Sequence, residues 1–243
     1  MLYRVKPGQV SYGEAVGIIL LENYVPFIPG DVANATSYDF PVRFQRVEGF
    51  TAERIFRHDM SLTDDILRAA QALEREGVRA ITGDCGFMIL YQDALMQAVS
   101  VPVFMSSLLQ IPFMRNLLPP GGKIGIVTAN SESLNEEILS RIGGKDCSDL
   151  SIAGMETSEY FYKAVFLEEG ELDSERIEQE VVSRALHLVK EDPAVRLILL
   201  ECSLMPPYGR AVYEAVGLPV FDYITMINYV YSTVVKRRFS GEM

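Results

Sequence analysis

Two of the three cysteines occupy equivalent positions in an internal repeat. A shift of 117 positions superposes residues 79–104 on residues 196–221, and 11 of the 26 aligned positions are identical. Cys85 and Cys202 are one of these identities, and the preceding acids, Asp84 and Glu201, also align. A thiol exchanges protons as an acid or, once ionised, as a base. Two such groups on opposite sides of a bound carbon could invert a stereocentre without a cofactor.

The surroundings of each cysteine affect its pKa in opposite directions. Each lies between a strand-like apolar run and a predicted helix start, and a helix N-terminus lowers a thiol pKa. The adjoining Asp84 and Glu201 raise it, because a nearby carboxylate disfavours the thiolate. We expect the two effects to balance close to neutral pH. A structural role or a redox pair are the alternatives, and Cys147, in a polar loop, is interpreted as structural or as a simple surface residue.

Several small polar residues are candidates to bind a substrate anion. Backbone N–H groups and hydroxyls at a helix start hold anions without a basic side chain. The candidates follow strand ends or lie in the first long loop, and they are Gly86, Thr128, Asn130, Ser131, Ser203 and Asn34. An ordinary helix cap is the alternative for Ser131, and a turn is the alternative for Asn34.

No metal or organic cofactor is predicted. The two histidines, His58 and His187, lie in charged, helical contexts without metal-ligand spacing. The segment 121–123 lacks the frame of a phosphate-binding loop.

Strands and helices must alternate along the chain to position these residues. Short β-branched runs predict strands at 15–21, 80–82, 101–105, 123–128, 151–153, 196–200 and 218–221. Amphipathic spacing predicts helices at 62–76, 91–99, 132–142, 174–191 and 210–216. This alternation is typical of an α/β fold with mostly parallel sheets covered on both faces, in which ligands bind beyond the carboxyl ends of the strands.

The repeat divides the chain into two similar halves. The first is predicted at 1–118 and the second at 119–220, with a change at the Pro- and Gly-rich segment 119–122. Residues 221–243 are expected to pack back on the first half as a helix. A pseudo-twofold axis between the halves would bring Cys85 and Cys202 to one cleft, with sulfurs about 6–9 Å apart so that a carbon fits between them.

Composition excludes several classes of protein. The chain of 243 residues has a formal net charge of −11 and is 49% hydrophobic. That hydrophobic share supports a packed core, and the acidic balance disfavours binding to nucleic acid or to anionic membranes. No apolar run reaches the length of a membrane-spanning helix. Three cysteines without a CxxC pair and no secretion signal suggest a reducing cytoplasm.

Four motifs resemble the pyridoxal-phosphate-independent aspartate/glutamate racemase superfamily, which includes hydantoin racemases, maleate isomerases and arylmalonate decarboxylases. They are GDC around Cys85, ECS around Cys202, IGIVTANS at 124–131 and PGDVANATSYDFPV at 29–42. The resemblance covers nearly the whole chain. It implies two flavodoxin-like α/β/α domains, an active site between them and one catalytic cysteine from each. It also implies that the turn at 128–131 binds a carboxylate.

The chain departs from the amino-acid racemases at the positions next to its cysteines. Gly86-Phe87 replaces Asn-Thr, Ser203 replaces Thr, and Glu22-Asn23 replaces the Asp-Ser that follows the first strand. These departures weaken the case for free aspartate or glutamate as substrate. Two cysteines argue against a decarboxylase that uses only the second, but they do not separate a racemase from a maleate-type isomerase.

The sequence therefore predicts a cofactor-independent racemase or epimerase, with Cys85 and Cys202 as its two acid/base groups. Its substrate would be a small carboxylate, an amino acid or a cyclic amide. A cis–trans isomerase, a malonate-type decarboxylase and a non-catalytic ligand-binding protein are the alternatives. The expected assembly is a homodimer.

Overall fold

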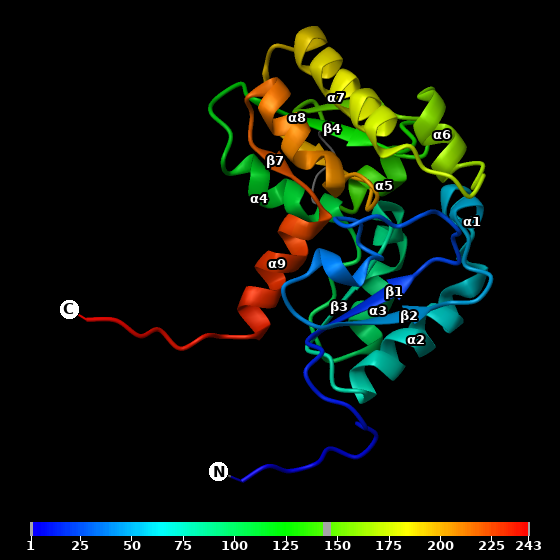
Figure 1. Cartoon of the computed structure of the whole chain (residues 1–243), viewed down its shortest axis with the longest axis vertical. Helices are drawn as coiled ribbons and strands as arrows, with labels where there is room; N and C mark the ends of the chain where they lie inside the picture. Colours follow the sequence, from blue (N-terminus) through cyan, green and yellow to red (C-terminus); the bar gives the residue numbers. More distant parts are fainter. Residues whose placement is uncertain (1, 143–146, 243) are drawn as a thin grey trace.

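The computed structural model describes residues 2–142 and 147–242, and these form two parallel β-sheets with helices around them (Figure 1). The first sheet has the order β2-β1-β3, from β1 (Val16–Leu20), β2 (Val42–Arg46) and β3 (Ala80–Gly83). The second has the order β5-β4-β6-β7, from β4 (Lys123–Thr128), β5 (Leu150–Gly154), β6 (Val195–Leu200) and β7 (Val220–Phe221). All strand pairs are parallel, which confirms the predicted α/β class.

Helices connect the strands in each half. They are α1 (Ala52–Phe56), α2 (Thr63–Arg75), α3 (Gln92–Ala98), α4 (Ile111–Arg115), α5 (Glu136–Ser140), α6 (Glu159–Val165), α7 (Ser174–Glu191), α8 (Gly209–Val216) and α9 (Tyr223–Val234). Short 3₁₀ turns include η3 (Gly86–Tyr91) and η4 (Ser107–Gln110). The predicted helix at 132–142 is shorter, because the Asn135 side chain accepts from the N–H of Ile138 and starts α5 there.

One glycine lies in the centre of each sheet, where the longest helix of that half packs closely. A Cβ at Gly17 of β1 would lie 3.0 Å from Leu73 of α2, and a Cβ at Gly125 of β4 would overlap Leu188 of α7. The two glycines thus let α2 and α7 approach equivalent strands. The resemblance between the halves is therefore structural and extends beyond the stretch repeated in the sequence.

Three sequence expectations about elements are wrong in detail. The predicted strand at 101–105 is reduced to a bridge between Val103 and Ile81, next to Pro102, which has no N–H to donate. Strand β2 was not expected. Helices α1, α4 and α6 were also missed, and each has only five to seven residues, too few to show a helical period.

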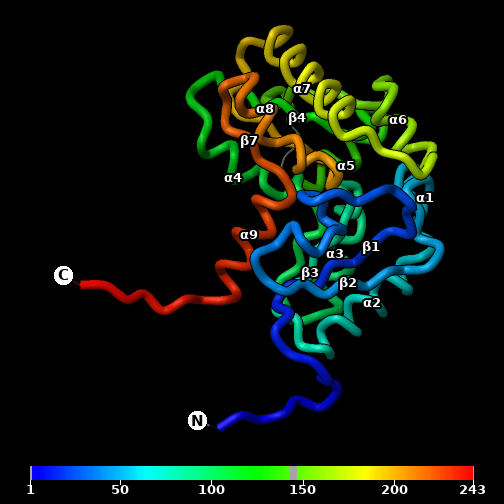
Figure 2. Tube along the Cα trace, viewed as in Figure 1, coloured from blue at the N-terminus to red at the C-terminus, as the bar shows by residue number. Residues whose placement is uncertain are grey.

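Helix α9 follows the second sheet and packs against the first. Its buried residues Tyr223 and Ile227 share a hydrophobic cluster with Val16, Ile18 and Ala80 of the first sheet. The Tyr223 hydroxyl donates to the carbonyl of Met105 at 2.9 Å. Figure 2 shows this helix running from the second half down along the first. The chain therefore crosses between the halves twice.

Among the described residues, every helix is too short or too polar to cross a lipid bilayer.

Candidate active site

Both repeat cysteines line one small cavity between the ends of β3 and β6. The two residues after β3 are Asp84 and Cys85, and the two residues after β6 are Glu201 and Cys202. The cavity has a volume of about 30 Å³, enough for about two water molecules. The strands end there because each is followed by a turn: Cys85 precedes η3, and the carbonyl of Cys202 accepts from the N–H of Met205 at 3.1 Å.

A buried carboxylate precedes each cysteine and, in each half, accepts a hydrogen bond from the backbone N–H of the residue that follows β1 or β4. Asp84 accepts from the backbone N–H of Leu21, the residue after β1, at 3.0 Å. Glu201 accepts from the backbone N–H of Ala129, the residue after β4. Burial raises the pKa of Asp84 to about 7 and that of Glu201 to about 7. Near neutral pH, each carboxyl group can therefore gain or lose a proton.

Thr128 positions Glu201 and does not line the cavity. Its hydroxyl donates to one Glu201 carboxylate oxygen at 2.8 Å. The other oxygen of Glu201 is buried and has no partner among the described residues. This free oxygen belongs to a cavity-lining side chain and lies against Gly86, where a Cβ would overlap it.

Both cavity thiols are protonated in this structure, which has no room for a substrate and is called the closed form below. Burial is the main cause that raises the pKa of Cys85 and of Cys202, and Glu201 is the largest charge effect on both. The Cys85 sulfur also accepts a hydrogen bond from the backbone N–H of Phe87, and the Cys202 sulfur accepts one from that of Leu204. Each bond lowers the thiol pKa by a smaller amount. The expectation of a thiol pKa near neutral is therefore wrong for the closed form, since burial outweighs the hydrogen bond.

Gly86 and Ser203 both line the cavity, directly after the cysteines. Within the described chain, neither backbone N–H donates to another protein group. The Ser203 hydroxyl donates to the carbonyl of Asp84, and the Ser107 hydroxyl donates to that of Glu201 at 2.7 Å. These two bonds link the halves at the cavity.

Three predicted contacts lie outside the cavity and bind groups of the protein. The Asn130 side chain accepts from the N–H of Ser133 at 3.0 Å, as a local turn. Ser131 donates through its hydroxyl, at 2.5 Å, and through its N–H, at 3.2 Å, to the Glu156 carboxylate. The Asn34 amide donates to the carbonyl of Phe27 at 2.8 Å and caps a 3₁₀ turn. The turn at 128–131 thus already holds a carboxylate of this chain.

The rest of the cavity wall is apolar and partly aromatic. It comprises Leu21, Ala52, Phe56, Phe87, Ala129, Val165 and Leu204, together with Asn23. Phe56 and Phe87 form an edge-to-face pair with ring centroids 5.3 Å apart. The lining contains two carboxylic acids and no lysine or arginine. The cavity therefore suits a small ligand that carries a positive charge.

Asp31 is a buried, titratable residue near the site that the sequence did not single out. It is buried in the first long loop, where one carboxylate oxygen accepts from the N–H of Ile28 at 2.8 Å and the other has no partner in the described structure. Burial raises its pKa to about 8, and its charge is one of the causes that raise the pKa of Cys202. Only its place in a loop rich in turn-forming residues was visible in the sequence.

Asp31 predicts a pH dependence of stability. Because its folded pKa lies above the ordinary value of 3.8, the folded state holds the proton more tightly, and the free energy of unfolding falls as pH rises from about 4 to about 8. Asp31→Asn should reduce the fall between pH 5 and pH 9 by about 4 kcal/mol, measured by urea unfolding. The matched control is Asp39→Asn at an exposed position of the same loop. An identical fall in Asp31→Asn and the native chain would refute this assignment.

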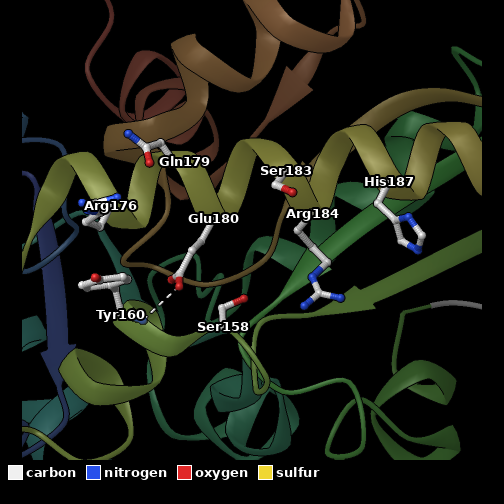
Figure 3. A pocket seen from close by; sticks show the side chains of 8 residues that line it. All are labelled: Ser158, Tyr160, Arg176, Gln179, Glu180, Ser183, Arg184 and His187. Atoms are coloured by element: carbon white, nitrogen blue, oxygen red, sulfur yellow. Dashed lines mark hydrogen bonds between the residues drawn. The ribbon is translucent and has the colours of Figure 1, made fainter.

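A wider, open pocket lies elsewhere, between α7 and the start of α6 (Figure 3). Figure 3 shows Arg176, Glu180 and Arg184 along one side of α7 facing Ser158 and Tyr160. The Glu180 carboxylate accepts from the N–H groups of Tyr160 and Phe161. None of its lining residues lines the cysteine cavity. Within residues 2–142 and 147–242, no group of three or more His, Cys, Asp or Glu is placed to hold a metal ion.

Comparisons with known proteins identify two kinds of relative. No protein-family model matches the sequence. The chain is 33% identical over 222 residues to a dimethylsulfoniopropionate lyase of Durusdinium sp. clade D, covering 88% of this chain and 73% of that protein. It is 33% identical over 234 residues to dimethylsulfoniopropionate lyase 3 of Emiliania huxleyi, covering 91% of this chain and 60% of that protein. The chain thus spans less than two thirds of the Emiliania relative.

Solved structures with the same fold come from the predicted superfamily. They include an allantoin racemase from Klebsiella pneumoniae, with a TM-score of 0.65 and 15% identity over 93% of this chain and 96% of that one. Unliganded arylmalonate decarboxylase gives a TM-score of 0.58 and 14% identity, covering 91% of this chain and 92% of that one. A glutamate racemase from Bacillus anthracis has a TM-score of 0.56 and 13% identity, covering 90% of this chain and 82% of that one. These likenesses confirm the predicted α/β fold, which this chain shares with the three enzymes.

Proposed function

The chain belongs to the dimethylsulfoniopropionate lyase family, and from this membership we propose that it is a carbon–sulfur lyase acting on a small sulfonium carboxylate. Such a substrate carries a sulfonium cation on the carbon β to a carboxylate. A base that removes a proton from the α carbon allows elimination. The C–H electron pair forms the carbon–carbon double bond, and the carbon–sulfur pair leaves with dimethyl sulfide. Acrylate remains, and no oxidant or water is consumed.

The composition of the cysteine cavity is the observation that carries this proposal. A sulfonium ion is a compact cation with methyl groups, like the quaternary ammonium ions that aromatic rings bind. Phe56 and Phe87 supply such rings, and Asp84 and Glu201 supply negative charge at near-neutral pH. The lining offers no lysine or arginine to pair with the additional carboxylate of an anionic amino acid.

The substrate cation also favours ionisation of one of the two cavity thiols, Cys85 or Cys202. In the closed form, burial and Glu201 keep the thiol protonated. A sulfonium ion within a few ångströms favours the thiolate, because opposite charges lower the pKa of an acid. Glu201, with its free oxygen and a pKa of about 7, is the acceptor that we assign to the thiol proton. The thiolate then removes the α proton as the general base.

The substrate carboxylate is assigned to the backbone N–H groups of Gly86 and Ser203. Both residues line the cavity, and both N–H groups are free of other partners in the described chain. Hydrogen bonds from them would stabilise the charge that develops on the carboxylate as the α proton leaves. Thr128 has a positioning role, since its hydroxyl holds Glu201.

A racemase is the second candidate, and the equivalence of Cys85 and Cys202 favours it. Elimination requires one base, whereas inversion requires a base on each face of the carbon. The cavity offers a thiol from each half, beside a similarly held carboxylate. This symmetry is compatible with either chemistry, because one thiol of the pair could serve alone.

One experiment separates the candidates. The purified protein is incubated with dimethylsulfoniopropionate in heavy water, with gas chromatography for dimethyl sulfide and NMR for acrylate. Amino acids, hydantoins and malonates are tested in parallel for deuterium at the stereocentre and for loss of carbon dioxide. We expect equal amounts of dimethyl sulfide and acrylate. Exchange or inversion of an amino acid or hydantoin, without dimethyl sulfide, would establish the racemase instead, and binding without turnover would refute both.

A further inference from the structure

A second hollow lies directly against the cysteine cavity. It is an open groove of about 670 Å³ between α1 and the segment that follows α6. The groove and the cavity share two lining residues, Ala52 and Phe56. These are four positions apart on α1 and therefore lie on the same face of the helix. This face of α1 is the wall between the small cavity and the larger, more open groove.

The Phe56 ring occupies the boundary itself. On one side it meets Phe87, a cavity residue, with centroids 5.3 Å apart and the rings nearly perpendicular. On the other side it stacks on Phe166, a groove residue, also at 5.3 Å and with 18° between the ring planes. Phe87 belongs to the first half and Phe166 to the second. At the edge of the cavity, Phe56 thus contacts one ring from each half.

The wall has to move before a substrate can bind. A cavity of about 30 Å³ holds about two waters, whereas a sulfoniopropionate has a three-carbon acid and two methyl groups on sulfur. Helix α1 has five residues, too few to be stable without its packing. It is flanked by Gly49, with φ of +73°, and by His58, with φ of +54°. The other lining residues, by contrast, mostly follow the hydrogen-bonded strands β1, β3, β4 and β6, and Val165 ends α6.

We propose that Phe56 is the gate between the groove and the cysteines, and that it limits the size of the alkyl groups on the substrate sulfur. The substrate enters from the groove when α1 shifts, and the bound substrate keeps the ring displaced, packed against the sulfur substituents. Longer alkyl chains displace the ring further and cost more of its contacts with Phe87 and Phe166. The size limit rests on the proposed lyase function, whereas the gate itself does not.

The size limit is tested with sulfoniopropionates that carry two methyl or two ethyl groups. Phe56→Ala and the milder Phe56→Leu are expected to raise the diethyl-to-dimethyl ratio of kcat/KM about tenfold, since a few methylenes in a pocket discriminate to this extent. The control is Phe113→Ala, which removes an exposed ring that stacks on Tyr229 outside both hollows. A ratio unchanged in both Phe56 variants would overturn the size limit.

The gate is tested without any substrate. Iodoacetamide labelling, followed by mass spectrometry of the peptides, gives the alkylation rates of Cys85 and Cys202, with Cys147 as internal reference. Phe56→Ala and Phe56→Leu should speed labelling of the two cavity cysteines about tenfold and leave Cys147 unchanged. Equal labelling rates in the native chain and both variants would overturn the gate. If the native protein releases no dimethyl sulfide, the proposed function fails, and the labelling still decides the gate.

Discussion

Replacing Cys85 or Cys202 by alanine is expected to have unequal effects on elimination. One variant should lose about 10²–10⁴-fold in kcat/KM, the contribution of a general base, and the other should lose much less. The reason is that elimination removes one proton from one face of the substrate, so only one thiolate acts as the base. The measurement is initial release of dimethyl sulfide at saturating and at low substrate, with Cys147→Ala as the control.

The same two variants distinguish the racemase. Inversion needs both thiols, so either substitution would abolish it, while each variant could still exchange the proton of one enantiomer with heavy water. The two variants would then prefer opposite enantiomers. Near-native rates of both reactions in both variants would mean that the cysteines are structural and that the assignment of the site is wrong.

Gly86→Ala is expected to reduce turnover at least about 10²-fold while the protein stays folded. The added methyl group would overlap the Glu201 carboxylate. Glu201 would be displaced from the two thiols, and the cavity would lose part of its small volume. The backbone of Gly86 does not require glycine, since its φ lies outside the left-handed region, so the cost to stability is that of displacing Glu201, about 1–3 kcal/mol.

The control for this variant is Gly209→Ala. Gly209 is a buried glycine at the start of α8 with an ordinary φ, and its Cβ would lie 3.2 Å from the Asp222 carboxylate. Steady-state kinetics and thermal unfolding are measured for both variants. Native turnover in Gly86→Ala would show that the position of Glu201 is unimportant for the chemistry.

The repeat explains why much of the scaffold could be predicted. Cys85 and Cys202 are 117 residues apart and each follows a buried strand, so the pattern alone brought them to equivalent strand ends. The parallel pairing within each half follows from the alternation of strands and helices. Helix α7 matches its predicted bounds because eighteen residues display a clear period and Asp173 caps its start.

The partners of the polar residues could not be predicted from local patterns. Thr128 and Ser131 looked alike as anion contacts after a strand. Their partners, Glu201 and Glu156, lie 73 and 25 residues further along the chain, and only the fold brings each pair together. Burial likewise decides the thiol pKa values, and neighbouring residue types do not reveal it.

Phe56 illustrates a different limit. The helix that carries it has only the residues AERIF, which show no amphipathic period. Its importance comes from two rings contributed by distant parts of the chain, Phe87 and Phe166. The internal repeat located the two cysteines because they occur in both halves. Phe56 lies outside the repeated stretch, so the repeat could not point to it.

The double crossing of the chain has a mechanical consequence for the two halves. One crossing lies just before α4, which packs against β4 of the second half, and the other runs from β7 to α9. They lie side by side, since the Gln110 amide, just before α4, donates to the carbonyl of Asp222, just before α9, at 3.0 Å. Two adjacent connections act as a double-stranded joint, which bends more easily than it twists. Cys85 and Cys202 would therefore regain the same mutual alignment after each opening of the cleft.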